Sequence, residues 1–254
     1  MNALRRIKRG WMNLRIAFII RETPDTLTLY LVDHEEGGRC FDYYAGQYLT
    51  FRFDTIAPKP LVRSYTMSSS PLEQEYIAVT VKETADGFIS RYLTKEIKVG
   101  DILRARGPIG KFCYHPQTDR GHLVMIAAGS GVTPFISIIR EYAARLEQED
   151  CPHKMTLVVG FRRREDVICH DLLQQWRKIP GLSIFICLSQ EPAIADADYH
   201  AGRIDSSYLA EVFAGDLADC TFMTCGPEGL MLNSLEFLRS RGVDDERIHN
   251  ESFA

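Results

Sequence analysis

The hydrophobic pattern of the chain changes near residue 115, and this change limits the folds that the chain can adopt. Before that point, apolar residues come in short runs that alternate with polar ones or are rich in β-branched side chains, as in β-strands. Turn-forming residues such as Pro24, Pro58 and Pro71 separate the runs. The predicted strands span 14–20, 26–32, 47–53, 62–68, 76–82 and 102–105. Six short strands with turns between them predict a closed or nearly closed antiparallel β-barrel.

From about residue 120 the pattern alternates between strands and helices. The predicted strands are 123–128, 155–160, 183–188 and 220–224, and the predicted helices are 135–147, 171–178, 206–212 and 230–241. Such alternation is typical of a doubly wound α/β fold, in which helices cover both faces of a parallel sheet. We therefore expect two domains, a barrel over 1–115 and an α/β domain over 116–254.

Composition narrows the class of protein. The 254 residues are 45% hydrophobic and 25% charged, which is ordinary for a globular chain, and the net charge of -4 gives no indication of a nucleic-acid partner. The first ten residues are basic, but no long apolar run follows them, so we expect neither a signal peptide nor a membrane span.

Seven scattered cysteines without a C-x-x-C pair favour reduced thiols and a cytoplasmic location, and they exclude an Fe–S cluster held by this chain alone. The dispersed histidines predict no metal site.

Four adjacent residues of a predicted strand indicate a binding site. Alternation along the strand places Arg63 and Tyr65 on one face, and Ser64 and Thr66 on the other. An arginine binds phosphate through two parallel hydrogen bonds, and an aromatic ring stacks on a flat heterocycle. The pattern therefore suits a phosphorylated flavin or nucleotide. The alternative is an ordinary strand with a core tyrosine and a solvated arginine.

A short helical segment over 87–93 interrupts the strands and offers a second anion site. Gly87 permits close approach of the backbone, Ser90 carries a hydroxyl, and a helix beginning here directs unpaired amides at an anion. The alternative is a plain crossover helix, with Ile89 among the residues of its apolar face.

A glycine-rich turn follows the first predicted parallel strand. Gly129 and Gly131 let a pyrophosphate approach the backbone, while Thr133 is a candidate N-cap and Pro134 fits the first helical position. This strand–turn–helix arrangement at the start of a doubly wound sheet predicts a dinucleotide site. It departs from the G-x-G-x-x-G pattern, because Pro134 stands near the place of the third glycine.

Two further segments contain candidate site residues. Cys225, Gly226 and Pro227 follow a predicted parallel strand, at the edge where such sheets bind ligands. The alternative for Cys225 is a buried structural thiol. Glu251 and Phe253 belong to a short terminal strand, for which a frayed tail is the alternative.

Together these motifs resemble the ferredoxin–NADP reductase superfamily over about residues 14–254. The matching motifs, in family order, are R-x-Y-[ST] at 63–66, G-x-x-S-x-x-L at 87–93, P-x-G-x-F at 108–112, G-x-G-x-T-P at 129–134, C-G-P at 225–227 and E-x-F at 251–253. The resemblance implies a flavin-binding barrel followed by a pyridine-nucleotide domain, with a hydride passing from NAD(P)H to bound FAD across the cleft between them. It further implies that electrons then pass to a separate ferredoxin-like, Fe–S or haem protein.

The resemblance also implies roles for single residues. Arg63 would bind the flavin phosphates, Tyr65 would stack on the isoalloxazine ring, and Thr66 would contact flavin N5. The implied flavin-binding set is Arg63, Ser64, Tyr65, Thr66, Val81, Lys82, Gly87, Ile89 and Ser90. The implied set for the dinucleotide is Gly129, Gly131, Thr133, Pro134, Cys225, Gly226 and Pro227. Cys225 and Glu251 would border the nicotinamide and form the catalytic set with Thr66, and Phe253 would cover the second flavin face.

Resemblance to particular subgroups of this superfamily implies which cofactor, coenzyme and acceptor the chain uses. Most relatives with R-x-Y-[ST] use FAD rather than FMN. NADP-specific relatives commonly carry Ser-Arg after the third strand of the α/β half, where this chain reads Leu-Ser-Gln-Glu at 188–191. The missing arginine and the carboxylate of Glu191 predict NADH, although the three arginines at 162–164 argue for NADPH. The nearest subgroup is that of the reductases of oxygenases and hybrid-cluster proteins, many of which continue into a [2Fe–2S] domain. This sequence ends at Ala254, so we expect the one-electron carrier to be a separate protein or a domain cut away.

Two other functions stay open at this point. The first is an NAD(P)H:flavin reductase that uses free flavin as its substrate, which Tyr65 and the 87–90 segment disfavour because both indicate tight flavin retention. The second is a non-catalytic nucleotide-binding adaptor, which would not need Arg63, Tyr65, Cys225 and Glu251 together.

Overall fold

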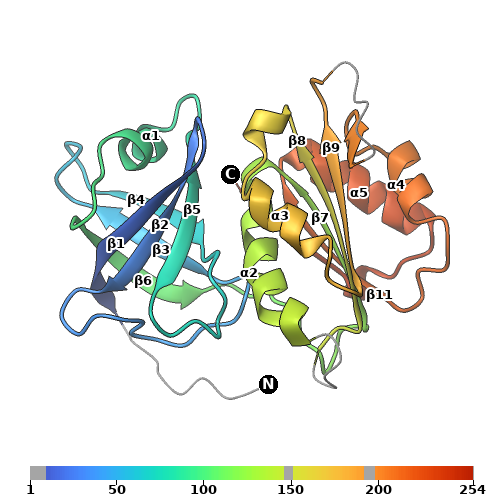
Figure 1. Ribbon diagram of the computed structural model, residues 1–254, viewed down its shortest axis with the longest axis horizontal. Helices are drawn as coiled ribbons and strands as arrows, with labels where there is room; N and C mark the ends of the chain where they lie inside the picture. The colour runs from blue at the N-terminus through green and yellow to red at the C-terminus, as the bar shows by residue number, and fades with distance from the viewer. Residues whose placement is uncertain (1–9, 146–150, 192–197, 254) are drawn as a thin grey trace. The chain divides into compact units, whose positions relative to one another are not determined.

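The computed structural model describes residues 10–145, 151–191 and 198–253 (Figure 1). The chain divides into two compact units, one formed by Met1–Cys113 with Thr133–Glu141 and the other by Tyr114–Val132 with Tyr142–Ala254. The division into domains over 1–115 and 116–254 stays a proposal. The basic residues of 1–9 and the end of the predicted helix 135–147 lie outside the described residues.

The first unit contains the six antiparallel strands that the sequence predicts. They are β1 Trp11–Thr23, β2 Thr26–Asp33, β3 Tyr48–Phe53, β4 Leu61–Thr66, β5 Ile77–Lys82 and β6 Ile102–Ile109. The strand order is β4-β3-β6-β1-β2-β5, and a bridge between Met67 and Val79 brings the two outer strands together. The helix α1 Phe88–Lys95 follows β5. The predicted barrel is thereby confirmed.

Alternation along the strands builds the core of this unit. Leu27, Leu29 and Leu31 of β2 are at most 2% exposed and pack in one cluster with Val79 and Val81 of β5. Since successive side chains of a strand point to opposite faces, the same strands present their other residues away from this cluster. The helix α1 adds Ile89 and Leu93 to the core, as its apolar spacing predicts.

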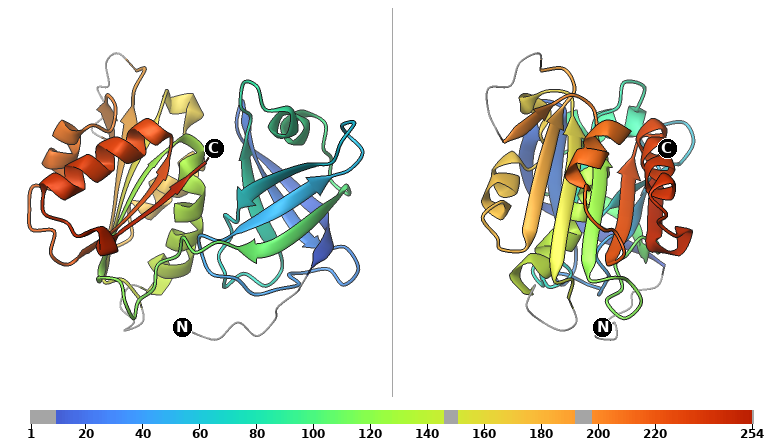
Figure 2. Two further views of the ribbon diagram at one scale, coloured as in Figure 1. Left: turned by 180° about the vertical axis from the view of Figure 1, so that it is seen from behind. Right: turned by 90° about the vertical axis from the view of Figure 1, so that its right-hand side faces the viewer.

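The second unit is built on a six-stranded parallel sheet. Its strands are β7 His122–Ala128, β8 Lys154–Phe161, β9 Leu182–Leu188, β10 Tyr199–Ala201, β11 Cys220–Gly226 and β12 Ile248–Ser252, in the order β10-β9-β8-β7-β11-β12. The helices are α2 Thr133–Tyr142, α3 His170–Trp176, α4 Ser206–Val212 and α5 Glu228–Ser240, of which α2 is grouped with the first unit. The predicted α/β sheet is confirmed, and α3 lies on the face opposite α4 and α5 (Figures 1 and 2).

The sheet brings distant motifs to one edge. All its neighbouring strands run parallel, so their carboxyl ends meet along the same edge. The turn after β7, the turn after β11 and the segment after β9 therefore lie at that edge. Apolar contacts of Phe222 with residues such as Leu209 of α4 and Phe237 of α5 fix the sheet beneath them.

Within the described part of the chain, no helix is long and apolar enough to cross a membrane. The same residues contain no cluster of three or more His, Cys, Asp or Glu side chains suited to a metal ion.

Candidate functional site

The strand β4 presents a cation beside an aromatic ring. Arg63 is exposed, and its Nη1 donates a hydrogen bond to the neighbouring Val62 carbonyl oxygen at 2.8 Å. Tyr65 is half-buried, with its ring centroid 6.1 Å from that of Phe51, and burial raises the pKa of its phenol to about 12 although Arg63 opposes the shift. The ring is therefore neutral and held by the barrel core, while the guanidinium is accessible to an anion.

The other predicted flavin residues of the barrel are held by local contacts. Ser64 is exposed and shares a hydrogen bond with Thr50 at 3.0 Å, whereas Thr66 is buried. Val81 belongs to the core, and Lys82 Nζ donates to Asp25 Oδ1 at 2.6 Å. Lys82 is thus already paired with a carboxylate, while Arg63 is directed at solvent.

The entry to α1 is fixed by a small network of hydroxyl groups. Ser90 Oγ donates to the Gly87 carbonyl oxygen at 3.0 Å and accepts from the Thr84 amide at 3.1 Å. A Cβ on Gly87 would lie 2.0 Å from Thr84 Oγ1 and 2.2 Å from Ser90 Oγ, so a larger residue would displace these two hydroxyl groups. The Ser90 hydroxyl makes its hydrogen bonds within the loop, and Ile89 is buried. An anion at this helix would therefore be bound by backbone amides.

These features fit FAD as a ligand. An accessible guanidinium and the amino end of α1 suit its two phosphates, and the half-buried Tyr65 ring suits its flat heterocycle.

The turn after β7 touches the turn after β11 in the second unit. Residues Gly129–Val132 form a 3₁₀ turn, in which Gly129 has φ +55°. A Cβ on Gly131 would lie 2.3 Å from the Cys225 carbonyl oxygen and 2.8 Å from Gly226 Cα. The fold thus joins two predicted motifs backbone to backbone, and Gly131 is the residue that permits it.

The helix α2 begins at Thr133, two residues before the predicted segment 135–147 and one residue before Pro134, the predicted first helical position. Thr133 is its first residue rather than the cap before it, and Pro134 is the second. The 3₁₀ turn runs directly into α2, which leaves no separate cap position. Pro134 keeps a position in the first turn, where a missing N–H costs nothing.

We expect Gly131→Ala to destabilise the second unit by about 2 kcal/mol, because the new methyl group overlaps backbone atoms that are not free to move. Thermal unfolding would measure the loss. Gly129→Ala is the matched control, since its Cβ would meet open space and only the positive φ is unfavourable, at about 1 kcal/mol. Equal losses for the two variants would contradict the close contact at Gly131.

The edge strand β12 places Glu251 beside Cys225. The two residues are paired in the register of the parallel strands, and their side chains lie on the same face. Cys225 is fully buried, and burial, followed by the nearby Glu251 carboxylate, raises the pKa of its thiol. Burial likewise raises the pKa of Glu251.

Glu251 Oε2 is buried and has no hydrogen-bond partner among the described residues. A buried polar atom without a partner is costly, so it favours a ligand that supplies a donor. The carboxamide N–H of a nicotinamide is such a donor. Pro227, next to Cys225 and Gly226, is the N-cap of α5, and Phe253 beyond β12 is 38% exposed.

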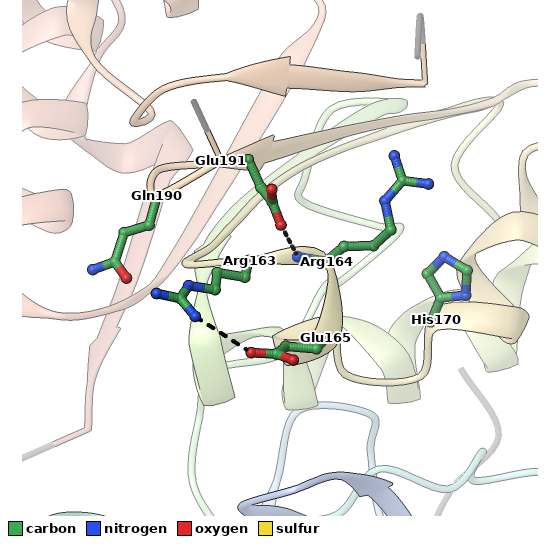
Figure 3. A pocket seen from close by; sticks show the side chains of 6 residues that line it. All are labelled: Arg163, Arg164, Glu165, His170, Gln190 and Glu191. Carbon is green, nitrogen blue, oxygen red and sulfur yellow. Dashed lines mark hydrogen bonds and ion pairs between the residues drawn. The ribbon is translucent and has the colours of Figure 1, made fainter. Parts of the chain in front are cut away.

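A pocket of about 810 Å³ lies where β8 and β9 end (Figure 3). Its lining residues are Arg163, Arg164, Glu165, His170, Gln190 and Glu191. Glu191 Oε1 accepts a hydrogen bond from the Arg164 backbone amide at 3.2 Å, while Arg163 Nη1 lies 3.7 Å from Glu165 Oε1. One carboxylate of the pocket thus lies near the Arg163 guanidinium, and the other is bonded to the Arg164 backbone.

An aromatic residue that the sequence pattern missed holds one of these arginines. The Arg164 guanidinium lies 4.4 Å from the ring centroid of Tyr199, and the Tyr199 hydroxyl is within 2.8 Å of His170 Nε2 and 3.0 Å of Gln174 Nε2. Tyr199 lies on β10, which has three residues and is too short to show a periodic pattern. Arg162, named from the sequence with the other two arginines, does not line the pocket.

Comparisons with known proteins agree with this geometry. The family described as oxidoreductase FAD-binding domain matches residues 19–114, and the family described as oxidoreductase NAD-binding domain matches residues 125–234. The NADH oxidoreductase HCR of Escherichia coli (strain K12) is 35% identical over 86% of this chain and 61% of its own length. A component of the 1,2-phenylacetyl-CoA epoxidase of the same strain is 32% identical over 95% of this chain and 67% of its own.

Two further comparisons extend the likeness. The ferredoxin reductase component of 3-ketosteroid-9-alpha-monooxygenase from Mycolicibacterium smegmatis is 30% identical over 95% of this chain and 65% of its own length. Among solved structures, the flavohem-like FAD/NAD-binding domain of nitric oxide dioxygenase from Vibrio cholerae O1 biovar El Tor superposes with a TM-score of 0.81 at 26% identity, covering 97% of this chain and 99% of that one. The chain spans between 60% and 67% of the length of the curated relatives it matches.

Proposed function

The chain belongs to the ferredoxin–NADP reductase family of FAD- and NAD-binding oxidoreductases, and from this membership we propose that it takes a hydride from NADH onto bound FAD and passes the electrons to a separate acceptor protein. The family resemblance expected from six motifs is thereby confirmed. The observation that carries the proposed reaction is the buried, unpartnered carboxyl oxygen of Glu251 beside Cys225, at the sheet edge that also holds the glycine turn.

In the proposed reaction the residues of the barrel bind and orient FAD. Arg63 neutralises its diphosphate, the α1 amides bind the same group, and the Tyr65 ring packs against the isoalloxazine. Thr66 donates a hydrogen bond next to N5. Bound FAD accepts two electrons together and releases them singly, so no separate acid–base pair on the protein has to supply that chemistry.

The residues of the second unit orient the dinucleotide. Backbone amides of the Gly129–Val132 turn bind its pyrophosphate, and Cys225 and Glu251 border the nicotinamide. Glu251 accepts a hydrogen bond from the carboxamide and thereby fixes the plane of the ring. Hydride transfer requires the reacting ring to be held in a defined orientation, so a small rotation of the nicotinamide would be costly.

The pocket after β8 and β9 supports NADH as the coenzyme. Glu191 suits the ribose hydroxyls and repels a 2′-phosphate, while Arg164 is held over Tyr199 and Arg163 lies near Glu165. The likeness to a protein named NADH oxidoreductase agrees with this choice. We further propose that the acceptor protein is an oxygenase or Fe–S component. The likeness to the reductase component of a monooxygenase and to a component of an epoxidase supports this choice.

The same proposal includes a cytoplasmic location. The seven cysteines all lie among the described residues and form no disulfide bond with one another, which supports a location where thiols are kept reduced.

The test of the proposed function is an anaerobic visible spectrum of the purified protein, titrated with NADH and separately with NADPH. We expect flavin absorbance that survives gel filtration and bleaches with NADH at a lower concentration than with NADPH. A protein that stays colourless after FAD is added, or flavin that neither coenzyme bleaches, would contradict the proposal.

Glu191→Gln tests the coenzyme assignment. Removing the negative charge is expected to lower the KM for NADPH roughly tenfold and to change the KM for NADH less, since like-charge repulsion of the 2′-phosphate is the main effect removed. Steady-state reduction of ferricyanide measures both constants. Glu211→Gln, an exposed carboxylate on α4 of the same unit, is the matched control. An unchanged ratio of the two KM values would assign selectivity to other residues.

A further inference from the structure

Backbone pairing alone holds the strand that carries Glu251 only weakly in the sheet. β12 has five residues, lies at the edge of the sheet and, among the residues that the structure describes, pairs only with β11. An edge strand is hydrogen-bonded to the sheet on one side only, so it opens more easily than a central strand. A slip of one residue would turn Glu251 away from Cys225, because successive side chains of a strand face opposite sides. The register of β12 therefore needs contacts beyond the backbone ladder.

Side chains on the two faces of β12 make such contacts. On one face Ile248 packs in the core cluster that includes Phe222, its partner on β11. On the other face His249 Nε2 lies 3.1 Å from Asp119 Oδ1, with the aspartate side chain 7% exposed and the histidine side chain 31%. His249 and Glu251 share this face by alternation. The histidine thus fixes the face from which Glu251 projects.

The carboxylate that His249 contacts is itself held in place. Asp119 Oδ2 accepts a hydrogen bond from the His115 amide at 2.6 Å, and the Arg120 amide donates to Thr221 Oγ1 of β11 at 2.7 Å. Burial acts to raise the pKa of Asp119, but the hydrogen bonds from His249 and the His115 amide outweigh it and lower the pKa. The loop is therefore bonded to the same strand with which β12 pairs. His249 gives β12 a second attachment to β11.

We propose that the Asp119–His249 pair is the positioning device for Glu251: it holds the edge strand β12 in register, so that the Glu251 carboxyl stays against Cys225. That a correctly placed Glu251 binds the nicotinamide rests on the proposed function. That the Asp119–His249 pair holds the register of β12 does not, because it follows from the contacts of β11, β12 and the 115–121 loop. Asp119 and His249 act through Glu251 and touch no reacting atom.

The test compares His249→Ala with His249→Gln and His153→Ala in the full-length protein. His153 Nε2 pairs with Asp219 Oδ2 at 3.3 Å in the same unit, but both side chains are more than 60% exposed, so its loss removes a surface pair of little value. Glutamine at position 249 keeps a donor for Asp119. Two measurements report the register without coenzyme: hydrogen exchange of the peptide that covers 248–253, and the rate at which N-ethylmaleimide labels Cys225, read by peptide mass spectrometry.

We expect His249→Ala to raise both rates about tenfold, because a hydrogen bond to a partly buried charge is lost and local opening becomes easier. His249→Gln should restore most of the protection, and His153→Ala should leave both rates unchanged. Unchanged exchange and labelling in His249→Ala, or an equal rise in His153→Ala, would overturn the proposal. If His249→Ala does not fold, Asp119→Asn provides the same comparison and should raise both rates in the same direction.

The rate of flavin reduction separates this proposal from the proposed function. If His249→Ala raises the exchange and labelling rates and also slows flavin reduction by NADH, both the positioning role and the proposed function are supported. If His249→Ala loosens β12 while reduction by NADH is unchanged in it and in Glu251→Ala, the positioning role stands and the proposed role of Glu251 fails.

Discussion

Arg63→Ala is expected to weaken FAD binding roughly 10- to 150-fold, which corresponds to the loss of one charge-assisted hydrogen-bonded contact with phosphate. The structure leaves the Arg63 guanidinium exposed, and among the described residues its one hydrogen bond goes to the carbonyl of its own neighbour. Removing it therefore disturbs the barrel little, and the loss falls on the ligand. Isothermal titration of the apoprotein with FAD measures the change.

The barrel offers a matched control for this variant. Arg104 of β6 is another exposed arginine, paired with Asp54 at 3.4 Å and lying 5.4 Å from the Trp11 ring centroid. We expect Arg104→Ala to bind FAD as the unmodified protein does. Stoichiometric FAD in purified Arg63→Ala with unchanged affinity would place the phosphate site elsewhere, and an equal loss in both variants would indicate a general effect of charge.

Glu251→Ala is expected to slow flavin reduction by NADH about 100-fold, at the lower end of the effects found when a positioned acid–base or hydrogen-bonding group is removed. The carboxyl oxygen that has no partner among the described residues, and that we propose orients the carboxamide, is then lost. FAD content should not change, because the residues proposed to bind the flavin phosphates, Arg63 and the amino end of α1, lie in the other unit. Anaerobic stopped-flow absorbance measures the reduction rate.

Two comparisons identify the property of Glu251 that matters. Glu246→Ala removes an exposed carboxylate of the turn before β12 and should leave the rate unchanged. Glu251→Gln keeps the carbonyl acceptor but not the charge. A rate near that of the unmodified protein in Glu251→Gln would assign the role to hydrogen bonding, whereas a rate near that of Glu251→Ala would assign it to the carboxylate. Unchanged reduction in Glu251→Ala would remove this residue from the mechanism.

The sequence predicts the strands of the barrel and the longer strands of the sheet because their side chains repeat with a clear period. β2, predicted at 26–32, spans Thr26–Asp33, and β5, predicted at 76–82, spans Ile77–Lys82. The period reports burial on one face, which is a local property. β10 could not be predicted in this way, since three residues carry no period, and it is Tyr199 of this strand that holds Arg164.

The structure adds a local packing reason for Gly87. The sequence predicts a glycine here for close approach of a phosphate. In the fold, a Cβ at Gly87 would also collide with the hydroxyls of Thr84 and Ser90, so any larger residue would force these side chains to move. Both demands are compatible, and the binding role of Gly87 and Ser90 stays a prediction.

The sequence by itself determined the class of each half, the order of the six motifs and hence the family, because these depend on local periodicity and on residue types at short spacing. Only the tertiary structure decided which of those residues meet. Gly131 contacts Cys225, Cys225 pairs with Glu251, and His249 reaches Asp119, across separations of 26 to 130 residues. Such contacts are fixed by the strand order and register of the sheet, which no local pattern encodes.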